Sequence, residues 1–309
     1  MLKDSTLRKK LRDIVSGKVL FNETMSRHTS IGVGGMADAL VSPETVKELG
    51  QIITCLRHYK TPFIPVGNGT NLIVRDGGYR GVIISMKGLN NITLNKRNAE
   101  QASIHTGAGA ALSEIVRLAA EESLGGMEFC AGIPGSVGGA VKMNAGAYGN
   151  EIKDTVEKIE LLNNSGEIRE LKKNSLKFEY RNLDLPEGSI IAGASFLLKE
   201  GTREHIQGRI SEILGMRKNK HPLEFRNSGS IFKNPRGGAP AGQIIDEIGL
   251  KGLQIGGAKI SEKHGNFIIN LGQAKAGDII ALIDMVKKKV KDERSITLET
   301  EVKIIGEDG

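Results

Sequence analysis

Residues 130–150 read CAGIPGSVGGAVKMNAGAYGN, with glycines at positions 132, 135, 138, 139, 146 and 149. Each glycine loses backbone entropy when a helix or strand orders it, so this density predicts a loop. Glycine also permits positive φ angles and close approach to the main chain, where exposed N–H groups bind anions. A flexible linker is usually polar, whereas this stretch carries Ile133, Val137, Val141 and Tyr148. We therefore favour a loop that cradles a cofactor or phosphate group over a purely structural loop.

A second glycine-rich turn, GNGTN at residues 67–71, lies between apolar stretches that predict strands at 63–66 and 72–74. Upstream of them, Ser42 precedes a proline and a glutamate and is the predicted N-cap of a helix with Val46, Leu49, Ile53 and Leu56 on one face. A glycine turn at the end of a strand, in the order strand, helix, strand, is a common phosphate-binding arrangement. We therefore expect phosphate-binding loops near 67–71 and 132–149.

Elsewhere, predicted strands and helices are mixed along the chain, which indicates a fold that contains both. Further strands are expected at 81–86, 102–106, 156–162, 167–171, 189–199, 227–235 and 296–305. The strands at 156–162 and 167–171 are expected to form a hairpin, and apolar and polar residues alternate in the strand at 296–305. Helices are expected at 112–122, 202–216 and 278–291, and the basic run 287–291 at the end of the last helix is expected to face solvent. Alternation would place Ser230, Phe232 and Asn234 on one side of their strand. The side chains expected to face inward from the second helix are those of Ile206, Ile210, Ile213 and Leu214.

Composition narrows the class of protein. The 309 residues suffice for two or three domains, and the net charge of +7 fits an anionic small-molecule partner. Aromatic residues make up only 4% of the chain and form no platform with basic residues, so we expect no nucleic-acid partner. Cys55 and Cys130 lack metal-ligand spacing, so no metal site is expected. The chain shows no signal-peptide pattern and no apolar run of about 18 residues, which predicts a cytoplasmic protein without membrane contact.

No standard motif assigns the reacting residues. Gly107-Ala108-Gly109 lacks the third glycine of the nicotinamide fingerprint, and the P-loop, HExxH and GxSxG patterns are absent. By pattern alone, Ser230 is an ordinary strand serine and Glu301 a solvated acid. Arg181 is a surface arginine by the same logic, although arginine also binds carboxylates through two parallel hydrogen bonds.

Nine blocks, in order from about residue 25 to 306, carry a resemblance over nearly the whole chain. They are HTSIGVGGMAD, PVGNGTNLIVRDGG, GAGA, GMEFCAGIPGSVGGAVKMNAGAYG, EYRN, GSIFKNP, AGQIIDEIGLKG, GGAKISEKHGNFIIN and LETEVKIIG. Together they resemble the shorter subclass of the UDP-N-acetylenolpyruvoylglucosamine reductases, flavoenzymes also called UDP-N-acetylmuramate dehydrogenases. One glycine loop would be weak support, whereas nine collinear blocks are strong.

The resemblance implies an α+β fold of the vanillyl-alcohol-oxidase (PCMH) type. Two subdomains, at 1–85 and 86–200, would bind FAD, and a C-terminal α+β domain at 201–309 would bind the substrate. The implied reaction is a step of peptidoglycan precursor synthesis. NADPH reduces FAD, and the reduced FAD converts UDP-N-acetylglucosamine enolpyruvate to UDP-N-acetylmuramate. The expected form is a monomer.

The resemblance also assigns three catalytic residues. Hydride from the flavin adds at C3 of the enolpyruvyl group and leaves carbanion or enolate character at C2. Ser230 would protonate C2, because an enolate carbon is basic enough to accept a proton from a well-placed hydroxyl. Arg181 and Glu301 would hold and polarise the substrate carboxylate. Glu301 assists an anion only when it carries a proton or donates through water, so we expect a raised pKa in the complex.

The matching blocks imply two sets of binding residues. The FAD-binding residues are Gly67, Asn68, Gly69, Thr70, Asn71, Leu72, Ala131, Gly132, Ile133, Pro134, Gly135, Ser136, Gly138, Gly139, Asn144, Ala145, Gly146, Ala147 and Tyr148. The substrate-binding residues are Arg217, Lys220, Lys233 and Asn234.

The chain departs from the family pattern at several positions. Gly32 replaces a common basic residue and Met36 a common proline, while Arg226-Asn227 replaces smaller residues before the serine. The substrate-covering tyrosine loop of one subclass is also missing. These departures put in question the flavin contact at position 32 and the closure over the UDP end.

Two other functions compete with the reductase. An oxygen-using flavin oxidase of the same fold often attaches its flavin covalently, so release of flavin on denaturation would favour the reductase. A non-catalytic nucleotide-sugar binding protein would bind ligand without consuming NADPH. The set of Ser230, Arg181 and Glu301 has a use only in the reductase.

Overall fold

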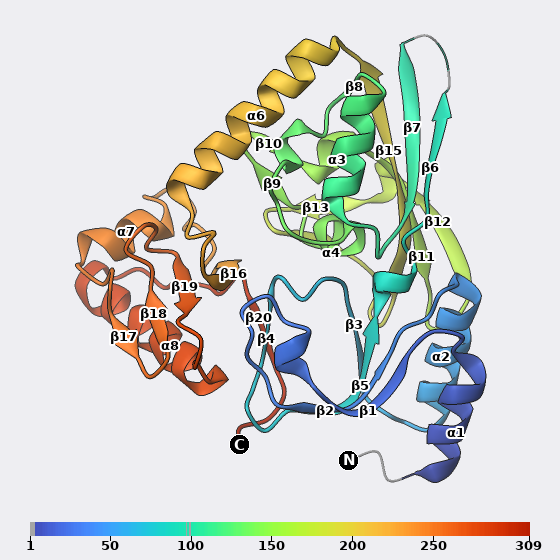
Figure 1. Ribbon diagram of the computed structural model, residues 1–309, viewed down its shortest axis with the longest axis horizontal. Helices are drawn as coiled ribbons and strands as arrows, with labels where there is room; N and C mark the ends of the chain where they lie inside the picture. The colour runs from blue at the N-terminus through green and yellow to red at the C-terminus, as the bar shows by residue number, and fades with distance from the viewer. Residues whose placement is uncertain (1–3, 97, 99) are drawn as a thin grey trace.

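The computed structural model describes residues 4–96, 98 and 100–309, which form three larger sheets with helices packed on them (Figure 1). The first, here called the N-terminal sheet, has the strand order β1-β2-β5-β3. Its strands are β1 (Val19–Thr24), β2 (Met36–Val41), β3 (Phe63–Val66) and β5 (Tyr79–Ser85). Strands β2 and β3 both run parallel to β5. The connection between β2 and β3 is the helix α2 (Val46–His58), against which α1 (Ser5–Ile14) packs.

Helix α2 begins at Thr45 rather than at Ser42. The Oγ1 atom of Thr45 accepts a hydrogen bond from the N–H of Glu48 at 3.1 Å, which satisfies one of the free donors of the first turn. The prediction of Ser42 as the N-cap is therefore wrong by one helical turn. The apolar face that buries Leu49, Ile53 and neighbouring residues in the core was placed correctly.

The central sheet is antiparallel and has the order β12-β11-β15-β7-β6, with the short β8 beside β15. Its strands are β6 (Ile92–Lys96), β7 (Gln101–Gly107), β8 (Leu124–Gly125), β11 (Val156–Leu162), β12 (Ile168–Lys172) and β15 (Ile190–Glu200). The pairing of β11 with β12 confirms the predicted hairpin. Helices α3 (Leu112–Glu121) and α4 (Val137–Lys142) lie over this sheet (Figure 1).

The glycine-rich stretch contains α4, so the expectation of a loop without helix or strand is wrong for part of it. Gly138 permits this helix to pack tightly, because a Cβ at that position would lie 2.8 Å from the Cβ of Ala108. Close packing therefore requires glycine here in spite of its low helix propensity. The rest of the stretch is turns and the two-residue strands β9 (Gly146–Ala147) and β10 (Asn150–Glu151), and α5 (Ile152–Thr155) follows it.

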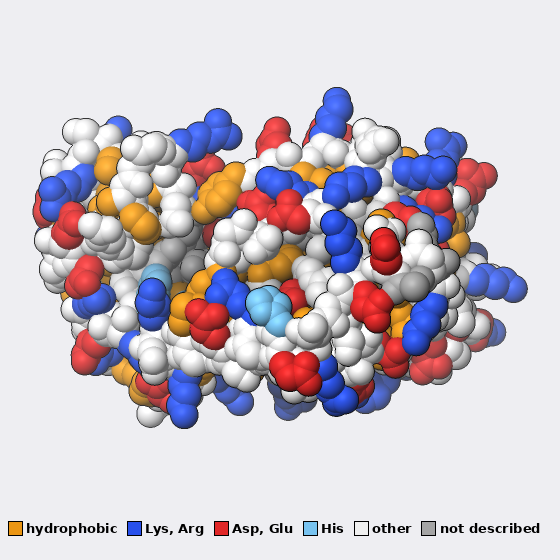
Figure 2. Space-filling model, turned by 90° about the horizontal axis from the view of Figure 1, so that it is seen from above, with side chains coloured by type: hydrophobic (Ala, Val, Ile, Leu, Met, Phe, Trp, Pro, Cys, Tyr) orange, Lys and Arg blue, Asp and Glu red, His pale blue; other side chains and the backbone are white. Residues whose placement is uncertain are grey.

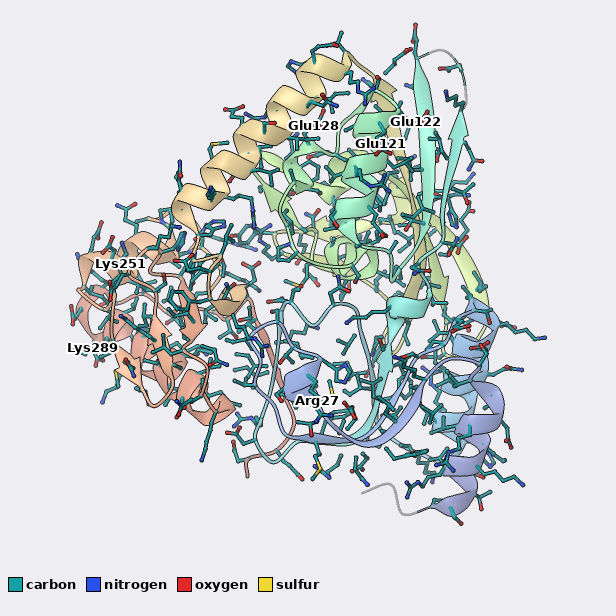
Figure 3. All side chains as sticks on the ribbon, in the orientation of Figure 1. Arg27, Glu121, Glu122, Glu128, Lys251 and Lys289 are labelled. Carbon is teal, nitrogen blue, oxygen red and sulfur yellow. The ribbon has the colours of Figure 1, made fainter. Side chains whose placement is uncertain are left out.

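The C-terminal sheet has the order β16-β19-β18-β17. Its strands are β16 (Arg226–Ser230), β17 (Gln254–Ile255), β18 (Ala258–Ile260) and β19 (Phe267–Asn270). Helices α7 (Ala241–Glu247) and α8 (Ala276–Arg294) share a buried core with it. The basic run near the end of α8 faces outward, as expected, and Figure 3 shows Lys289 on the outer edge of this part of the molecule.

Helix α6 (Arg203–Lys220) connects the central sheet to the C-terminal sheet. It continues four residues beyond the predicted end at residue 216, and Thr202 occupies the N-cap position without a side-chain hydrogen bond. Ile206 and Ile213 are buried as expected, but Leu214 is 45% exposed, so its inward orientation is a wrong prediction. The helix contacts α3 and the 3-10 turn Glu128–Cys130.

Two predicted strands are shorter than expected. Strand β16 ends at Ser230, and a register shift separates Asn227 from Ser230 in its pairing with β19. Ser230 and Phe232 therefore do not share a strand face; Phe232 is 2% exposed and belongs to the C-terminal core. In the last segment, burial alternates as predicted, but only β20 (Lys303–Ile305) is a strand.

The C-terminal segment returns to the N-terminal region. Strand β20 pairs in parallel with β4 (Leu72–Val74), and the C-terminal core includes Ile31, Val33 and Ile73. The Asp76 carboxylate accepts hydrogen bonds from the first N–H groups of α8 at 2.8–3.0 Å. The division of the chain at residues 85 and 200 stays a prediction. Within the described residues, no helix is long and apolar enough to cross a membrane.

The remaining elements are small. They are the hairpin β13 (Lys177–Glu179) and β14 (Asn182–Asp184), and the 3-10 turns Met25–Arg27, Met86–Gly88 and Lys173–Ser175. Basic and acidic side chains are interspersed over the face seen in Figure 2.

Candidate active site

The turn at residues 67–71 offers backbone donors to an anion. In the described part of the chain, the N–H groups of Asn68, Gly69 and Thr70 have no hydrogen-bond acceptor. Gly69 has φ +66°, and a Cβ there would overlap the carbonyl oxygen of His28. The turn is held in place by a hydrogen bond of 3.0 Å from the N–H of Ser30 to the carbonyl of Gly69. Consecutive free N–H groups at a glycine turn form an anion-binding nest.

The glycine-rich stretch at residues 130–150 lies against this turn. Thr70 Oγ1 donates a hydrogen bond of 3.1 Å to the carbonyl of Pro134. A Cβ at Gly67 would overlap the hydroxyl of Ser136, so the close approach of the two loops requires glycine at position 67. The structure thus brings together the predicted FAD-binding residues of the two stretches. The donor set, which combines free N–H groups with small side chains, fits the diphosphate of a dinucleotide cofactor.

Some predicted FAD-binding residues are already engaged within the protein. Asn144 is fully buried and donates to Glu151 Oε2 at 3.0 Å and to the carbonyl of Glu179 at 3.1 Å. The side chain of Asn71 donates at 3.1 Å to the carbonyl of Glu301. These two side chains therefore hold the loops in shape, and Asn71 links the 67–71 turn to a predicted catalytic residue.

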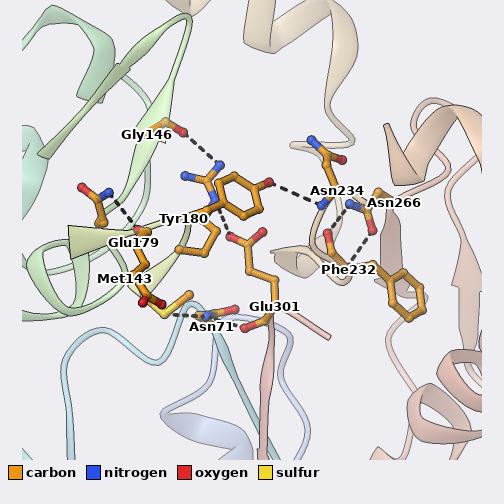
Figure 4. A network of polar contacts seen from close by, with 11 residues as sticks. Asn71, Met143, Gly146, Glu179, Tyr180, Phe232, Asn234, Asn266 and Glu301 are labelled. Carbon is orange, nitrogen blue, oxygen red and sulfur yellow. Dashed lines mark hydrogen bonds and ion pairs between the residues drawn. The ribbon is translucent and has the colours of Figure 1, made fainter. Parts of the chain in front are cut away.

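Arg181 and Glu301 form an ion pair, with Arg181 Nε 3.2 Å from Glu301 Oε1 (Figure 4). Arg181 comes from the turn between β13 and β14 and has φ +57°, and its Nη2 donates to the carbonyl of Gly146 at 3.1 Å. Glu301 comes from the segment before β20. The side chains are only 20% and 18% exposed, respectively. The pair therefore connects the glycine-rich stretch to the C-terminal segment, and both of its side chains are mostly shielded from solvent.

Burial raises the pKa of the Glu301 carboxyl above its ordinary value, and the nearby Arg181 guanidinium opposes this rise. The Lys233 ammonium also lowers the pKa, but less. The direction agrees with the sequence-based expectation of a raised pKa and is already present in the protein alone. A carboxyl group with a raised pKa can carry a proton that an ordinary glutamate would have released.

Replacing Glu301 by glutamine should remove a pH-dependent cost to stability. Because its folded-state pKa is raised, the folded protein holds a proton that the unfolded chain has lost, so wild-type stability falls as pH rises through this interval. Glutamine does not titrate. The free energy of unfolding of the wild type relative to Glu301→Gln should therefore fall by up to about 1.4 kcal/mol per pH unit above about pH 4, until the folded-state pKa is passed.

Urea unfolding at a series of pH values measures this difference. The control is Glu299→Gln, two residues away, whose side chain is 74% exposed. A difference between wild type and Glu301→Gln that stays constant with pH would contradict the raised pKa.

Ser230 lies at the end of β16, next to the segment that carries Glu301. The carbonyl of Ile231 accepts a hydrogen bond of 2.8 Å from the N–H of Glu301. Phe232 forms an isolated antiparallel bridge with Thr300. The main chain thus brings Ser230, Glu301 and, through the ion pair, Arg181 into one region.

The four predicted substrate-binding residues are distributed over this region. Lys233 Nζ pairs with Glu299 Oε2 at 3.1 Å, close enough to Glu301 to affect its pKa. Asn234 Oδ1 accepts from the N–H of Ala241 at 3.0 Å and so holds the start of α7. Arg217 is hydrogen-bonded to Tyr148, and burial lowers the pKa of Arg217. Lys220 is exposed near the end of α6, and no contact brings it to the Arg181–Glu301 pair.

Two residues of the site were missed from the sequence. The hydroxyl of Tyr180 accepts a 3.4 Å hydrogen bond from the N–H of Asn234, and the Arg181 guanidinium lies 5.3 Å from its ring centre (Figure 4). Asn266 bonds to both backbone groups of Phe232. Tyr180 belongs to the EYRN block and Asn266 to the block that ends in HGNFIIN, where a polar side chain directly before an apolar run was a usable signal.

The departure at position 32 has a structural counterpart. Gly32 has φ +73°, and a Cβ there would lie 2.8 Å from Arg226 Nη1 and 3.0 Å from Arg226 Cδ. Arg226 therefore fills the space that a side chain at position 32 would need. The same contact region includes a hydrogen bond of 2.7 Å from Ser30 Oγ to the carbonyl of Asn227. The two unusual features noted in the sequence thus face each other across the contact between the N-terminal region and β16.

Comparison with known proteins assigns the family. Residues 37–172 match a family described as an FAD binding domain, and residues 221–305 match the C-terminal domain of UDP-N-acetylenolpyruvoylglucosamine reductase. The chain is 53% identical over 309 residues, covering 100% of the chain and 99% of the relative, to UDP-N-acetylenolpyruvoylglucosamine reductase of Syntrophus aciditrophicus (strain SB). It is 45% identical, over 96% of the chain and 97% of the relative, to the reductase of Caldanaerobacter subterraneus subsp. tengcongensis.

A solved structure agrees with this assignment. The crystal structure of UDP-N-acetylenolpyruvylglucosamine reductase (MurB) from Thermus caldophilus is similar with a TM-score of 0.79 and 36% identity, covering 94% of this chain and 98% of that one. The predicted fold, an FAD-binding fold of the vanillyl-alcohol-oxidase type followed by a C-terminal α+β domain, is thereby confirmed. This chain belongs to the UDP-N-acetylenolpyruvoylglucosamine reductase family.

Proposed function

We propose that Ser230, Arg181 and Glu301 carry out the reaction of this family in this chain. The chain is an FAD-dependent reductase that uses NADPH to convert UDP-N-acetylglucosamine enolpyruvate to UDP-N-acetylmuramate. The observation that carries the residue assignment is the buried Arg181–Glu301 pair, joined through the main chain to Ser230. A guanidinium, a carboxyl group that can hold a proton and a hydroxyl together meet the needs of an unsaturated carboxylate substrate.

When bound, FAD would supply the hydride chemistry that connects NADPH with C3 of the enolpyruvyl group. The free N–H groups at 68–70 would hold its diphosphate. Arg181 binds the substrate carboxylate, which replaces or shares the contact now made by Glu301. Glu301 in its protonated form donates a hydrogen bond to the same carboxylate as negative charge develops there.

Ser230 completes the reduction by giving its hydroxyl proton to C2, and the hydroxyl is then reprotonated from water. The hydride at C3 and the proton at C2 together convert the double bond to a single bond. A carbanion at C2 is a far stronger base than water, so it can take a proton from a neutral hydroxyl. The side chain of Ser230 therefore needs only the right position, not a lowered pKa. Lys233 supplies a positive charge near Glu301, and Arg217 and Lys220 would contact the diphosphate or carboxylate of the substrate.

We also propose that the protein is a monomer without a nucleic-acid partner. We propose that it acts in the cytoplasm, because its substrate is a nucleotide-linked precursor and NADPH is a cytoplasmic reductant. Size-exclusion chromatography at micromolar concentration tests the monomer, and a dimer peak would exclude it.

An anaerobic titration tests the function. The purified protein should be yellow, its flavin spectrum should bleach on addition of NADPH, and UDP-N-acetylglucosamine enolpyruvate should restore the oxidised spectrum with formation of UDP-N-acetylmuramate. Reoxidation by oxygen alone would support a flavin oxidase. Binding of the nucleotide sugar without NADPH consumption would support a binding protein.

A further inference from the structure

We propose that Asn266 is a positioning residue that holds Ser230 and Glu301 in register with each other through the main chain of Ile231 and Phe232. The inference rests on the proposed function, because it assigns a purpose to the relative placement of those two residues. Among the described residues, the side chain of Asn266 hydrogen-bonds to the main chain of Phe232 and not to the proposed catalytic or flavin-binding residues.

Asn266 makes three hydrogen bonds to the segment that follows Ser230. Its Oδ1 accepts from the N–H of Phe232 at 2.8 Å, and its Nδ2 donates to the carbonyl of Phe232 at 2.8 Å (Figure 4). Its own carbonyl accepts from the N–H of Ile231 at 2.9 Å. Asn266 is 4% exposed, so water does not compete for these bonds.

The other side of the same segment holds Glu301. The carbonyl of Ile231 accepts from the N–H of Glu301 at 2.8 Å, and the N–H of Lys233 donates to the carbonyl of Glu299 at 2.9 Å. Residues 231–233 thus lie between Asn266 on one side and the Glu301 segment on the other. A shift of this segment would move Ser230, which directly precedes it in the chain, and Glu301, which is hydrogen-bonded to it.

Within the described residues, the side chain of Asn266 takes the place of a regular sheet partner for the segment after Ser230. Strand β16 ends at Ser230, and its register with β19 already shifts between Asn227 and Ser230. The side chain of Asn266 supplies the pair of hydrogen bonds that a neighbouring strand would have made to Phe232. It does so just beyond the residue that must deliver the proton.

The geometry requires a group that donates and accepts at the same time. The N–H of Phe232 can only donate and its carbonyl can only accept, so the orientation of the Asn266 amide is determined. An aspartate carboxylate of the same shape would accept from the N–H but would face the carbonyl with a negative charge. A protonated aspartic acid would restore both bonds, because it has one donor and one acceptor.

This property gives a test with the Asn266→Asp variant. We expect NADPH to reduce its flavin at the wild-type rate, while the rate of enolpyruvyl reduction at pH 8 falls by about 10- to 100-fold, as for a misplaced reacting group. As pH is lowered, the ratio of the variant rate to the wild-type rate should rise about tenfold per pH unit, because protonation of the aspartate restores the missing donor. Stopped-flow spectroscopy of the two half-reactions from pH 5 to 8 measures both.

Asn270→Asp is the matched control. Asn270 is the last residue of β19, the strand that directly follows Asn266; it is 6% exposed and also donates to a backbone carbonyl, that of Ile31, at 2.8 Å. The same chemical change there should lower the melting temperature comparably without a selective, acid-rescued loss of the second half-reaction. If Asn270→Asp shows the same rescue, the effect is general to buried asparagines and the proposal is wrong.

The Asn266→Ala variant removes the bonds without adding charge. It should show a similar loss in the second half-reaction but no acid rescue. Equal losses in both half-reactions, or wild-type rates in Asn266→Asp at pH 8, would overturn the positioning role. Should Asn266→Asp fold only below about pH 6, the ratio measured there against wild type still decides, because a restored hydrogen bond predicts a ratio near one. A wild-type enzyme that cannot reduce the enolpyruvyl group would instead refute the proposed function.

Discussion

Replacing Ser230 by alanine should leave reduction of the flavin by NADPH nearly intact and slow reduction of the enolpyruvyl group by about 10²-fold or more. The hydroxyl is the proposed source of the C2 proton, and alanine retains the backbone but offers no proton. In the variant, a water molecule would have to protonate C2, and the protein would not hold that water in position. Single-turnover measurements separate the two half-reactions, and the second should carry the whole loss.

Ser228→Ala is the control for this experiment. Ser228 lies two residues away on the same strand and is 2% exposed, and its hydroxyl has no hydrogen-bond partner among the described residues. Its loss should leave both half-reactions unchanged. If Ser230→Ala slows the two half-reactions equally, or neither, Ser230 is not the proton donor.

Replacing Gly69 by alanine should abolish stable FAD binding. A Cβ at this position would overlap the His28 carbonyl oxygen, which belongs to the backbone and cannot rotate away, and φ +66° disfavours alanine in addition. The turn must therefore change shape and lose N–H contacts to the diphosphate. Each hydrogen bond to a charged group contributes about 1.5–3 kcal/mol, so loss of two lowers the affinity by about 10²-fold or more.

Flavin content after purification and titration of FAD into the apoprotein measure this loss. Gly249→Ala is the matched control, because Gly249 has a similar φ of +72° but has no atom within 4 Å of the position its Cβ would take. It should cost some stability and leave FAD affinity unchanged. A yellow Gly69→Ala protein with wild-type affinity would exclude the 67–71 turn from the diphosphate site.

Local patterns predicted the elements better than they predicted their ends. The burial of Leu298 and Val302 follows the predicted alternation, yet only residues Lys303–Ile305 form a strand. Alternation reports which side chains face a core, whereas a strand also needs a neighbour with free backbone groups. The neighbour of this segment is strand β4, more than 200 residues away in the chain, and no local sequence pattern predicts this pairing.

The same limit applies to the site. Arg181, Ser230 and Glu301 looked ordinary by pattern, because their chemistry depends on being brought together across 120 residues. The resemblance named them, and the structure shows the ion pair between Arg181 and Glu301; the catalytic roles of the three residues stay a proposal. Leu214 shows the reverse case: its spacing predicted burial, but its side chain lies beside Gly132 and stays 45% exposed.

The pairing of β20 with β4 has a consequence for how the molecule folds. Closing so long a loop is entropically costly, and contacts of this kind form slowly. The N-terminal and central sheets are built from nearer neighbours in the chain, so they are expected to assemble first. Docking of the β20 segment, which brings Glu301 to Arg181, then comes late. During folding, the proposed FAD-binding loops would thus form before the proposed catalytic residues come together.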